Sequence, residues 1–359
     1  MMSNPNNSLD RRTVLKSFLA LTASGLSRSY AAVQSERITD MGIVIYDFNL
    51  RRRWMKKQNP AQDLFEPLTF LKHCHSLGAG GMQANLGAMQ PAAITQLRDF
   101  AEQQDLFIDA IISPPKDKGD VDRFAAEIQT AHDLGVQAVR TTIIPGRRYE
   151  RFKTLEEFRE FERRGEGMLR LAVPILRKNR VVLAVENHKD QRIDERVELF
   201  ERLSCEFIGA CLDTGNSIAL LDDPYEAVEA LVPFAMTVHL KDQSLEMYDG
   251  GFLLGDVPLG QGSLDLKRMV QSIRKTKPDI RFALELITRD ALQVPCLTDR
   301  YWAPMPDISA RQLAKILRLV TDNRKKAQQV SVLPENRQVE LETANVLASL
   351  RYAAEELEL

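Results

Sequence analysis

The chain has 359 residues, of which 44% are hydrophobic and 27% charged, and its formal net charge is −2. This composition excludes a disordered chain, a collagen-like repeat and a small disulfide-rich scaffold. A sequence pI near 6.3 provides no field that would attract a polyanion, so nucleic acid is not expected as a partner. The length exceeds one average domain, but an α/β barrel uses roughly 250 residues as a single unit.

Residues 1–32 differ from the rest of the chain. They hold four basic residues and one acidic residue, a net charge of +3, whereas the remaining residues carry −5. Arg11 and Arg12 precede a modestly apolar run at 17–26, and small residues follow at 29–32. This run is too short for a permanent membrane span, which needs about 20 apolar residues. The pattern resembles a twin-arginine signal peptide, which implies export to the periplasm by the twin-arginine machinery. The alternative is an amphipathic first helix of the fold.

The cysteines give no sign of a disulfide framework. The chain has four cysteines, Cys74, Cys205, Cys211 and Cys296. None of them form a C-x-x-C pair, and their spacing suits neither a zinc knuckle nor a set of disulfide bonds. We expect Cys211, within an apolar run, to be a small core residue.

From residue 41 onward, short apolar runs alternate with longer amphipathic segments, which is typical of βαβ units with a parallel sheet. The runs predict strands at 42–46, 81–85, 107–112, 138–143, 181–186, 207–213, 236–239 and 282–285. Helical patterns lie at 63–77, 91–104, 120–134, 154–178, 194–203, 224–231, 264–275 and 309–324. Eight strand and helix pairs predict a (β/α)8 TIM barrel over residues 40–327. No GxGxxG follows the first strand, which argues against a dinucleotide-binding sheet.

Three further segments accompany the predicted barrel. Residues 328–359 form a C-terminal extension that contains a charged amphipathic helix from residue 334. We expect this helix to pack under the barrel, although it could instead join a partner subunit of a homo-oligomer. Long connections at 243–263 and 287–308 follow the last two strands, so both should cover the mouth of the barrel as lids.

Polar residues end four of the predicted strands, at Glu186, Asp213, His239 and Glu285. The active site of such a barrel lies where its strands end, so these side chains should meet there. Three carboxylates and an imidazole in one mouth would repel one another without a cation, and this donor set suits one divalent ion. We predict Mn²⁺ first, with Mg²⁺, Co²⁺ or Zn²⁺ as alternatives. A helix cap or an ion-paired strand end is the structural alternative for each residue.

Five motifs in order carry a family resemblance. They are Val185-Glu186-Asn187-His188, Leu212-Asp213-Thr214-Gly215-Asn216, Val238-His239-Leu240-Lys241-Asp242, Pro258-Leu259-Gly260-Gln261-Gly262 with Asp265, and Leu284-Glu285. Over roughly residues 40–325 the chain resembles the sugar phosphate isomerase/epimerase superfamily, with a xylose isomerase-like TIM barrel like that of AP endonuclease family 2. The resemblance implies that Glu186, Asp213, His239 and Glu285 hold the metal. It also implies that Glu186 and Glu285 act as an acid/base pair on a substrate bound through adjacent hydroxyl and carbonyl oxygens.

Other residues near these strand ends are candidates for substrate contact. His188 is predicted to bind a hydroxyl or transfer a proton, and Lys241 to neutralise an enolate oxygen or bind a carboxylate. Asn216 is a substrate-binding candidate where ketose 3-epimerases and apurinic-site endonucleases often have histidine. Arg147 could hold an anionic group, and Tyr248 and Trp302 in the two lids could stack on a sugar. Loop contacts, ion pairs, solvated charges and lid anchors are the respective structural alternatives.

The sequence thus predicts an exported, metal-dependent isomerase or epimerase of a sugar or keto sugar. The reaction is α-proton abstraction through a metal-stabilised enediolate. The first alternative is a dehydratase or lyase on a 3-keto sugar, keto-inositol or keto-glycoside, since elimination begins with the same step. A remote alternative is a non-catalytic sugar-binding barrel. An endonuclease is disfavoured because the chain lacks the additional histidines of a three-metal cluster and a basic surface for DNA.

Overall fold

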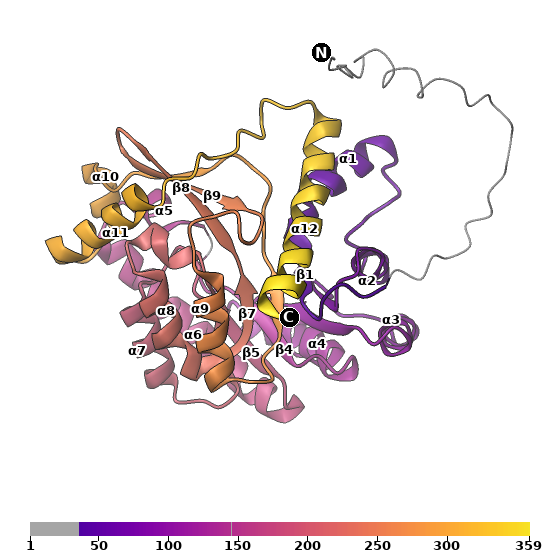
Figure 1. Ribbon diagram of the computed structural model, residues 1–359. Helices are drawn as coiled ribbons and strands as arrows, with labels where there is room; N and C mark the ends of the chain where they lie inside the picture. The colour runs from indigo at the N-terminus through magenta and orange to yellow at the C-terminus, as the bar shows by residue number, and fades with distance from the viewer. Residues whose placement is uncertain (1–35, 145) are drawn as a thin grey trace, which may run out of the picture. The chain divides into compact units, whose positions relative to one another are not determined.

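Eight parallel strands close into a barrel in the order β1-β10-β7-β6-β5-β4-β3-β2 (Figure 1). The computed structural model describes residues 36–144 and 146–359, so the predicted signal segment lies outside the described residues. The barrel strands are β1 (Gly42–Val44), β2 (Gly81–Ala84), β3 (Phe107–Ile111), β4 (Ala138–Thr141), β5 (Val182–Glu186), β6 (Ile208–Asp213), β7 (Ala235–Leu240) and β10 (Phe282–Leu284). Every predicted strand is confirmed, with ends that agree to within two residues. Their near-continuous apolar runs are buried on both faces, as in other parallel sheets.

The interior near the amino ends of the first strands is filled by one aromatic ring. A Cβ atom added to Gly42 would lie 2.4 Å from the Phe107 ring, and one added to Gly81 would lie 2.5 Å from it. Both contacts are shorter than any side chain tolerates, so glycine at these two positions makes room for Phe107. The ring therefore plugs the end of the barrel that lies opposite the strand carboxyl ends.

Helices surround the strands and follow the predicted pattern. Several begin with a side chain that accepts hydrogen bonds from the first turn, such as Glu66, Thr154 and Asp223. The predicted helices correspond to α2 (Pro67–Ser76), α3 (Pro91–Gln103), α4 (Val121–Asp133), α6 (Leu155–Asn179), α7 (Ile193–Leu203), α8 (Pro224–Leu231), α9 (Leu266–Thr276), α11 (Ala310–Asp322) and α12 (Glu335–Leu357). The pattern does not predict α1 (Asn49–Gln58), α5 (Arg148–Arg151) or α10 (Asp299–Trp302). In the part of the chain that the structure describes, no helix combines the length and apolarity that crossing a membrane requires.

The two predicted lids form one small sheet rather than two loops. The connection after β7 is an antiparallel hairpin of β8 (Asp242–Tyr248) and β9 (Gly251–Val257). Strand β11 (Leu292–Val294), from the connection after β10, pairs with β9. The connection at 243–263, predicted as a long loop, therefore consists largely of two strands. A single residue, Lys241, separates the end of β7 from the start of β8, with no turn signal between them.

The eighth place in the ring of helices belongs to α12 and not to α11. α12 packs against α9, α1 and β10, between the helices that precede and follow it around the barrel (Figure 1). α11 instead contacts β8 of the hairpin. The prediction that 309–324 is a helix is confirmed, but its predicted position in the barrel is wrong because the hairpin provides its apolar contact surface. The C-terminal helix is confirmed as part of the same compact unit.

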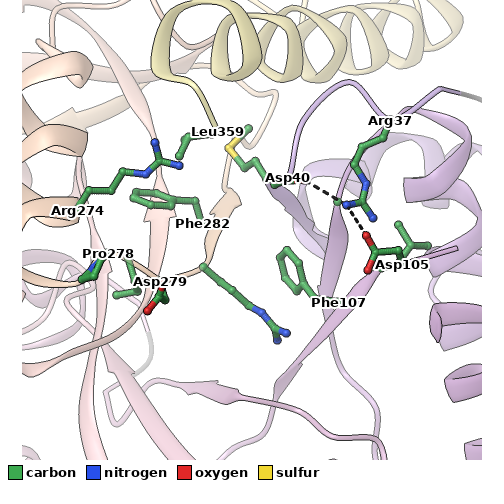
Figure 2. Close-up of a pocket in the computed structure, with 14 residues that line it drawn as sticks. Arg37, Asp40, Asp105, Phe107, Arg274, Pro278, Asp279, Phe282 and Leu359 are labelled. Carbon is green, nitrogen blue, oxygen red and sulfur yellow. Dashed lines mark hydrogen bonds and ion pairs between the residues drawn. The ribbon is translucent and has the colours of Figure 1, made fainter.

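A cavity of about 390 Å³ lies at the amino ends of the strands, beside Phe107 and Phe282 (Figure 2). At its edge Arg37 bridges Asp40 and Asp105, with N–O distances of 3.1 Å to each. Polar side chains line much of it, but it is at the opposite end of the barrel from the strand carboxyl ends. The chemistry described next therefore does not involve this cavity.

Candidate metal centre

The four predicted ligands lie at one level of the barrel wall. Asp213 is the last residue of β6 and is directly opposite His239 in the register of β6 and β7. Glu186 ends β5, and Glu285 follows β10 with its backbone N–H donating to Leu240 O at 3.1 Å. The parallel register thus brings to one point four residues that are far apart in sequence.

These four side chains form a buried cluster that could hold a metal ion. One ligand atom of each lies within 4.8 Å of those of the others. Their exposed fractions are 4% or less. Three carboxylates and one imidazole are a donor set for a divalent cation, and such a concentration of buried acidic groups requires compensating charge.

Two buried atoms of the cluster have ionic neighbours but no hydrogen bond of good geometry, namely Asp213 Oδ2 and His239 Nδ1. The other ring nitrogen of His239, Nε2, lies 2.7 Å from Gln83 Oε1. Because an amide oxygen only accepts, Nε2 must donate, and Nδ1 faces the carboxylates, 3.5 Å from Glu285 Oε2. A hydrogen bond of this kind orients metal-binding histidines and fixes their tautomer. Burial opposes protonation of His239, but Cys211 and Glu285 raise its pKa well above the ordinary value, so a metal ion bound at Nδ1 would take the place of a proton. The donor set and its open atoms therefore fit a metal ligand set.

Glu186 is held on both carboxylate oxygens. Arg140 donates to Oε2 through Nε at 2.7 Å and also through Nη2. Asn216 Nδ2 donates to Oε1 at 2.8 Å. Burial favours the neutral acid, but Arg140 outweighs it and lowers the pKa of Glu186. Glu186 is consequently a fixed anion at neutral pH.

Lys241 connects two of the other ligands. Its Nζ lies 2.7 Å from Glu285 Oε2 and 3.2 Å from Asp213 Oδ2. Burial opposes ionisation of Glu285, but Lys241 and His239 hold its pKa well below the usual range. Burial raises the pKa of Asp213 to about 6, against the attraction of Lys241. The ion pair with Glu285 is the structural alternative that the sequence left open for Lys241, and its predicted role toward a substrate stays a prediction.

Asn216 joins Lys241 to a second buried lysine. Lys189 Nζ donates to Asn216 Oδ1, and Lys241 Nζ lies 3.3 Å from the same oxygen. Lys189 and Lys241 are 4% and 2% exposed. Burial and the neighbouring Lys241 lower the pKa of Lys189 to about 8, so its ammonium still predominates at neutral pH. The mouth therefore carries two cations beside the carboxylate cluster.

Two further titratable groups lie near the cluster in their neutral forms. Burial lowers the pKa of His188 to about 3, and its Nδ1 has no hydrogen-bond partner. Asp47, just beyond β1, accepts a hydrogen bond from Leu286 N at 2.8 Å through Oδ1, while Oδ2 is buried without a partner. Burial raises the pKa of Asp47 well above its ordinary value, and the nearby Glu285 adds to this. Both side chains can offer hydrogen bonds to a neutral ligand.

The remaining predicted substrate contacts have partners of their own. Arg147 Nε lies 2.6 Å from Glu150, one turn further along the chain. Trp302 Nε1 donates to Cys296 O at 2.9 Å, and its ring packs edge-on against Tyr301. Tyr248 is the last residue of β8, at the turn of the hairpin, and half-buried. The described contacts of these three residues fit lid anchors and a loop ion pair.

One family motif has a structural role. The Asp242 carboxylate accepts hydrogen bonds from the backbone N–H groups of Gly260, Gly262 and Leu264. Gly260 has a φ of +78°, and a Cβ on Gly262 would lie 2.1 Å from Asp242 Oδ1. Asp265 then caps α9 through Arg268 N at 3.0 Å. The glycine-rich turn thus fixes the connection between the hairpin and α9.

Sequence reasoning did not single out four of the residues around the centre, namely Gln83, Arg140, Lys189 and Asp47. Gln83 and Arg140 are polar residues inside otherwise apolar strands, the same signal that identified the ligands on later strands. Asp47 and Lys189 lie three residues beyond their strands, in segments whose path the apolar pattern does not define.

Comparison with known proteins places this site in context. The profile of the family described as xylose isomerase-like TIM barrel matches residues 71–318. The 3-oxo-isoapionate decarboxylase of Pectobacterium atrosepticum is 27% identical over 121 residues, which are 33% of this chain and 44% of that protein. The chain therefore spans less than half the length of this curated relative.

Two solved structures have the same fold. A xylose isomerase-like TIM barrel protein from Mycobacterium smegmatis, in complex with magnesium, has a TM-score of 0.53 and 16% identity, covering 79% of this chain and 96% of that one. The 3-keto-D-glucoside 4-epimerase of E. coli has a TM-score of 0.52 and 12% identity, covering 77% and 98%. Because the family profile covers more than half of the residues, the chain belongs to the xylose isomerase-like TIM barrel family.

Proposed function

We propose that the protein is a metal-dependent enzyme that acts on a keto sugar by forming an enediolate. The observation that carries this proposal is the buried cluster of Glu186, Asp213, His239 and Glu285 with the Lys241 ammonium beside it. A divalent ion held by these four residues, Mn²⁺ being our first candidate, would polarise a carbonyl and a neighbouring hydroxyl. The sugar-processing relatives of the same fold support a small polyol substrate.

In this proposal Glu285, Lys241 and His188 each have a separate role in the reaction. Among the described contacts of Glu285, both ionic ones fall on Oε2, which leaves Oε1 for the proton on the carbon between carbonyl and hydroxyl. Lys241 can neutralise charge that develops on the adjacent oxygen. His188, neutral and with a free Nδ1, can contact a hydroxyl. Glu285 is therefore the base in this proposal, with Lys241 as electrostatic support.

Return of the proton to the neighbouring carbon gives an isomerase, which needs one base. Return to the opposite face gives an epimerase, for which Glu186 would be the second acid. The magnesium-containing and epimerase relatives support this class of reaction. It is the first form of the proposal.

A lyase is the second form, and one contact favours it. Both oxygens of Glu186 are engaged by Arg140 and Asn216, so this carboxylate is poorly placed to carry a proton. Elimination from the enediolate expels a leaving group from the β carbon. Decarboxylation of a 3-oxo acid instead forms an enolate directly, as the C–C bond breaks and CO₂ leaves, and the enolate then takes up one proton. Neither reaction requires a second carboxylate acid. The match to a decarboxylase over 121 residues points the same way.

The experiment is incubation in D₂O with ketoses, 3-keto glycosides and 3-oxo sugar acids, with added Mn²⁺ or after chelation. We expect about one divalent ion per chain by elemental analysis, and deuterium at the carbon next to the carbonyl. Glu285→Gln should abolish the exchange, whereas Glu198→Gln, at an exposed position of α7, should not. Product identity separates the two forms of the proposal. Protein that binds no metal and exchanges no deuterium would contradict both.

A further inference from the structure

Lys189 is a buried cation without an anionic partner. It is 4% exposed, and among the described residues its ammonium contacts the Asn216 amide oxygen but makes no ion pair. An ammonium has three donors, so two are left without an assigned acceptor. The carboxylates of Asp256 and Asp213 lie near enough to favour the ammonium but do not pair with it. Burying a charge without an ion pair costs stability unless something in the functional state balances it.

Hydrogen bonds hold both the backbone and the side chain of Lys189. Its backbone carbonyl accepts a hydrogen bond from Arg148 N at 2.8 Å, and its Nζ is held by Asn216. Asn216 in turn contacts Glu186 and Lys241, which belong to the cluster. The ammonium therefore lies one amide group away from the place where a substrate carbonyl would bind.

With His239 neutral, as it must be to bind an ion, the charges of the acidic and basic side chains at the centre cancel one another. The carboxylates of Glu186, Asp213 and Glu285 are matched by three cations that contact them or Asn216, namely Arg140, Lys241 and Lys189. A divalent ion would therefore leave an excess of two positive charges. A substrate that brings its own negative charge would reduce that excess, whereas a neutral sugar would not.

We propose that Lys189 binds a carboxylate of the substrate, and that the substrate class is therefore a keto-sugar acid rather than a neutral keto sugar. This inference rests on the proposed function and names its substrate more closely. A carboxylate suits the spare donors of one ammonium. A phosphate brings three acceptor oxygens, and the nearest turn cannot supply the extra donors because Gly215 N and Asn216 N already donate to Asp213 Oδ1.

The test is calorimetric binding to the Mn²⁺-loaded protein of three stable four-carbon probes: erythronate, erythritol and erythritol 4-phosphate. We expect erythronate to bind at least tenfold more tightly than erythritol. Lys189→Met should remove that preference and leave erythritol binding and metal content unchanged, while Lys189→Arg should retain it. Lys178→Met, at an exposed position near the end of α6, is the matched control and should behave as wild type.

A second measurement separates substrate binding from a structural role. If Lys189 is an uncompensated charge, Lys189→Met should raise the Tm of the protein without ligand, whereas loss of a structural contact would lower it. Equal affinity for erythronate and erythritol, or a preference that persists in Lys189→Met, would overturn the proposal. Tighter Lys189-dependent binding of the phosphate would overturn the carboxylate assignment. Intact metal binding with either result would leave the proposed function standing.

Discussion

At the scale of single residues, the Arg140 and Glu186 pair decides how the centre works. Glu186 is completely buried, and the Arg140 guanidinium is the largest influence that keeps it ionised, beside the hydrogen bond from the Asn216 amide. Such a carboxylate is a good ligand because it never has to release a proton. It is a poor acid for the same reason. Glu285 differs from it in having one carboxylate oxygen, Oε1, outside its described ionic contacts.

Arg140→Met tests this pair in the metal-free protein. The folded pKa of Glu186 lies below its unfolded value, so ionised Glu186 stabilises the fold above about pH 4.5, and this contribution is lost as pH falls through the folded pKa. Without Arg140 we expect a loss of about 3–5 kcal/mol at pH 7 by urea unfolding. The loss should shrink near pH 4, because Glu186 of the variant, buried without Arg140, is then protonated and no longer an unpaired charge. Arg163→Met, which breaks an exposed pair with Glu156, should have little effect, and equal losses in the two variants would contradict the argument.

The sequence predicted the metal-ligand candidates better than it predicted the residues that contact them. Glu186, Asp213 and His239 end apolar strands at nearly equal spacing, and this spacing alone brings them to one level. Arg140 and Gln83 carry a similar signal on β4 and β2, but they lie inside the predicted strands rather than at their ends, and the strand end is the position that predicts a ligand. Lys189 could not be predicted, because its position depends on how the chain turns after β5 and on the amide of Asn216.

At the scale of elements, Arg148 anchors the segment between β10 and α11. It is completely buried, donates to Pro304 O at 2.8 Å and to Glu195 Oε2 at 2.7 Å, and lies 3.4 Å from the centre of the Phe158 ring. Tyr301 adds a hydrogen bond to Ala219 O at 3.0 Å. The segment is therefore fixed to the loops of neighbouring strands.

Comparison of Arg148→Met with Arg147→Met tests this anchor. Arg148→Met should increase backbone hydrogen exchange in residues 299–308 at least tenfold, because its contact with Pro304 is lost. It should also destabilise the protein by about 3 kcal/mol, since Glu195 loses one of its two arginine partners. Arg147→Met, which loses a partly exposed pair with Glu150, should change neither. If hydrogen exchange in residues 299–308 were unchanged in Arg148→Met, Tyr301 and its neighbours would be enough to anchor the segment without Arg148.

The periodicity of apolar residues predicted the strands and helices that have a regular pattern of buried residues. Strands buried on both faces and helices with one apolar stripe appear directly in the sequence. The hairpin does not, because β8 mixes Asp242, Gln243 and Glu246 with apolar residues and its pairing partners come from two separate connections. α1 was missed for a related reason, since none of its residues is buried.

At the scale of the molecule, α12 completes the ring of helices. Its buried face includes Val346, Leu350 and Ala353, each with no exposed surface, and its Glu342 accepts hydrogen bonds from Leu50 N and Arg51 N at the start of α1. The helix is thus integral to the barrel rather than an appendage.

Leu350→Ala tests this view. The substitution removes a fully buried side chain, so we expect a loss of about 2–5 kcal/mol, visible as one cooperative urea transition shifted to lower concentration. Val332→Ala, at a side chain that is 70% exposed, should leave the transition in place. A separate early transition in Leu350→Ala, with the main one unmoved, would mean that α12 unfolds independently.

The contact between α1 and α12 also has a kinetic consequence. Leu50 and Glu342 are 292 residues apart in sequence, yet their hydrogen bond helps to close the ring. Closing so long a loop is entropically costly and comes late, because its gain is realised only when nearly all strands are in place. Until then the apolar faces of α9 and β10 lack their cover, so the intermediate most prone to aggregation should be a nearly complete barrel that lacks α12.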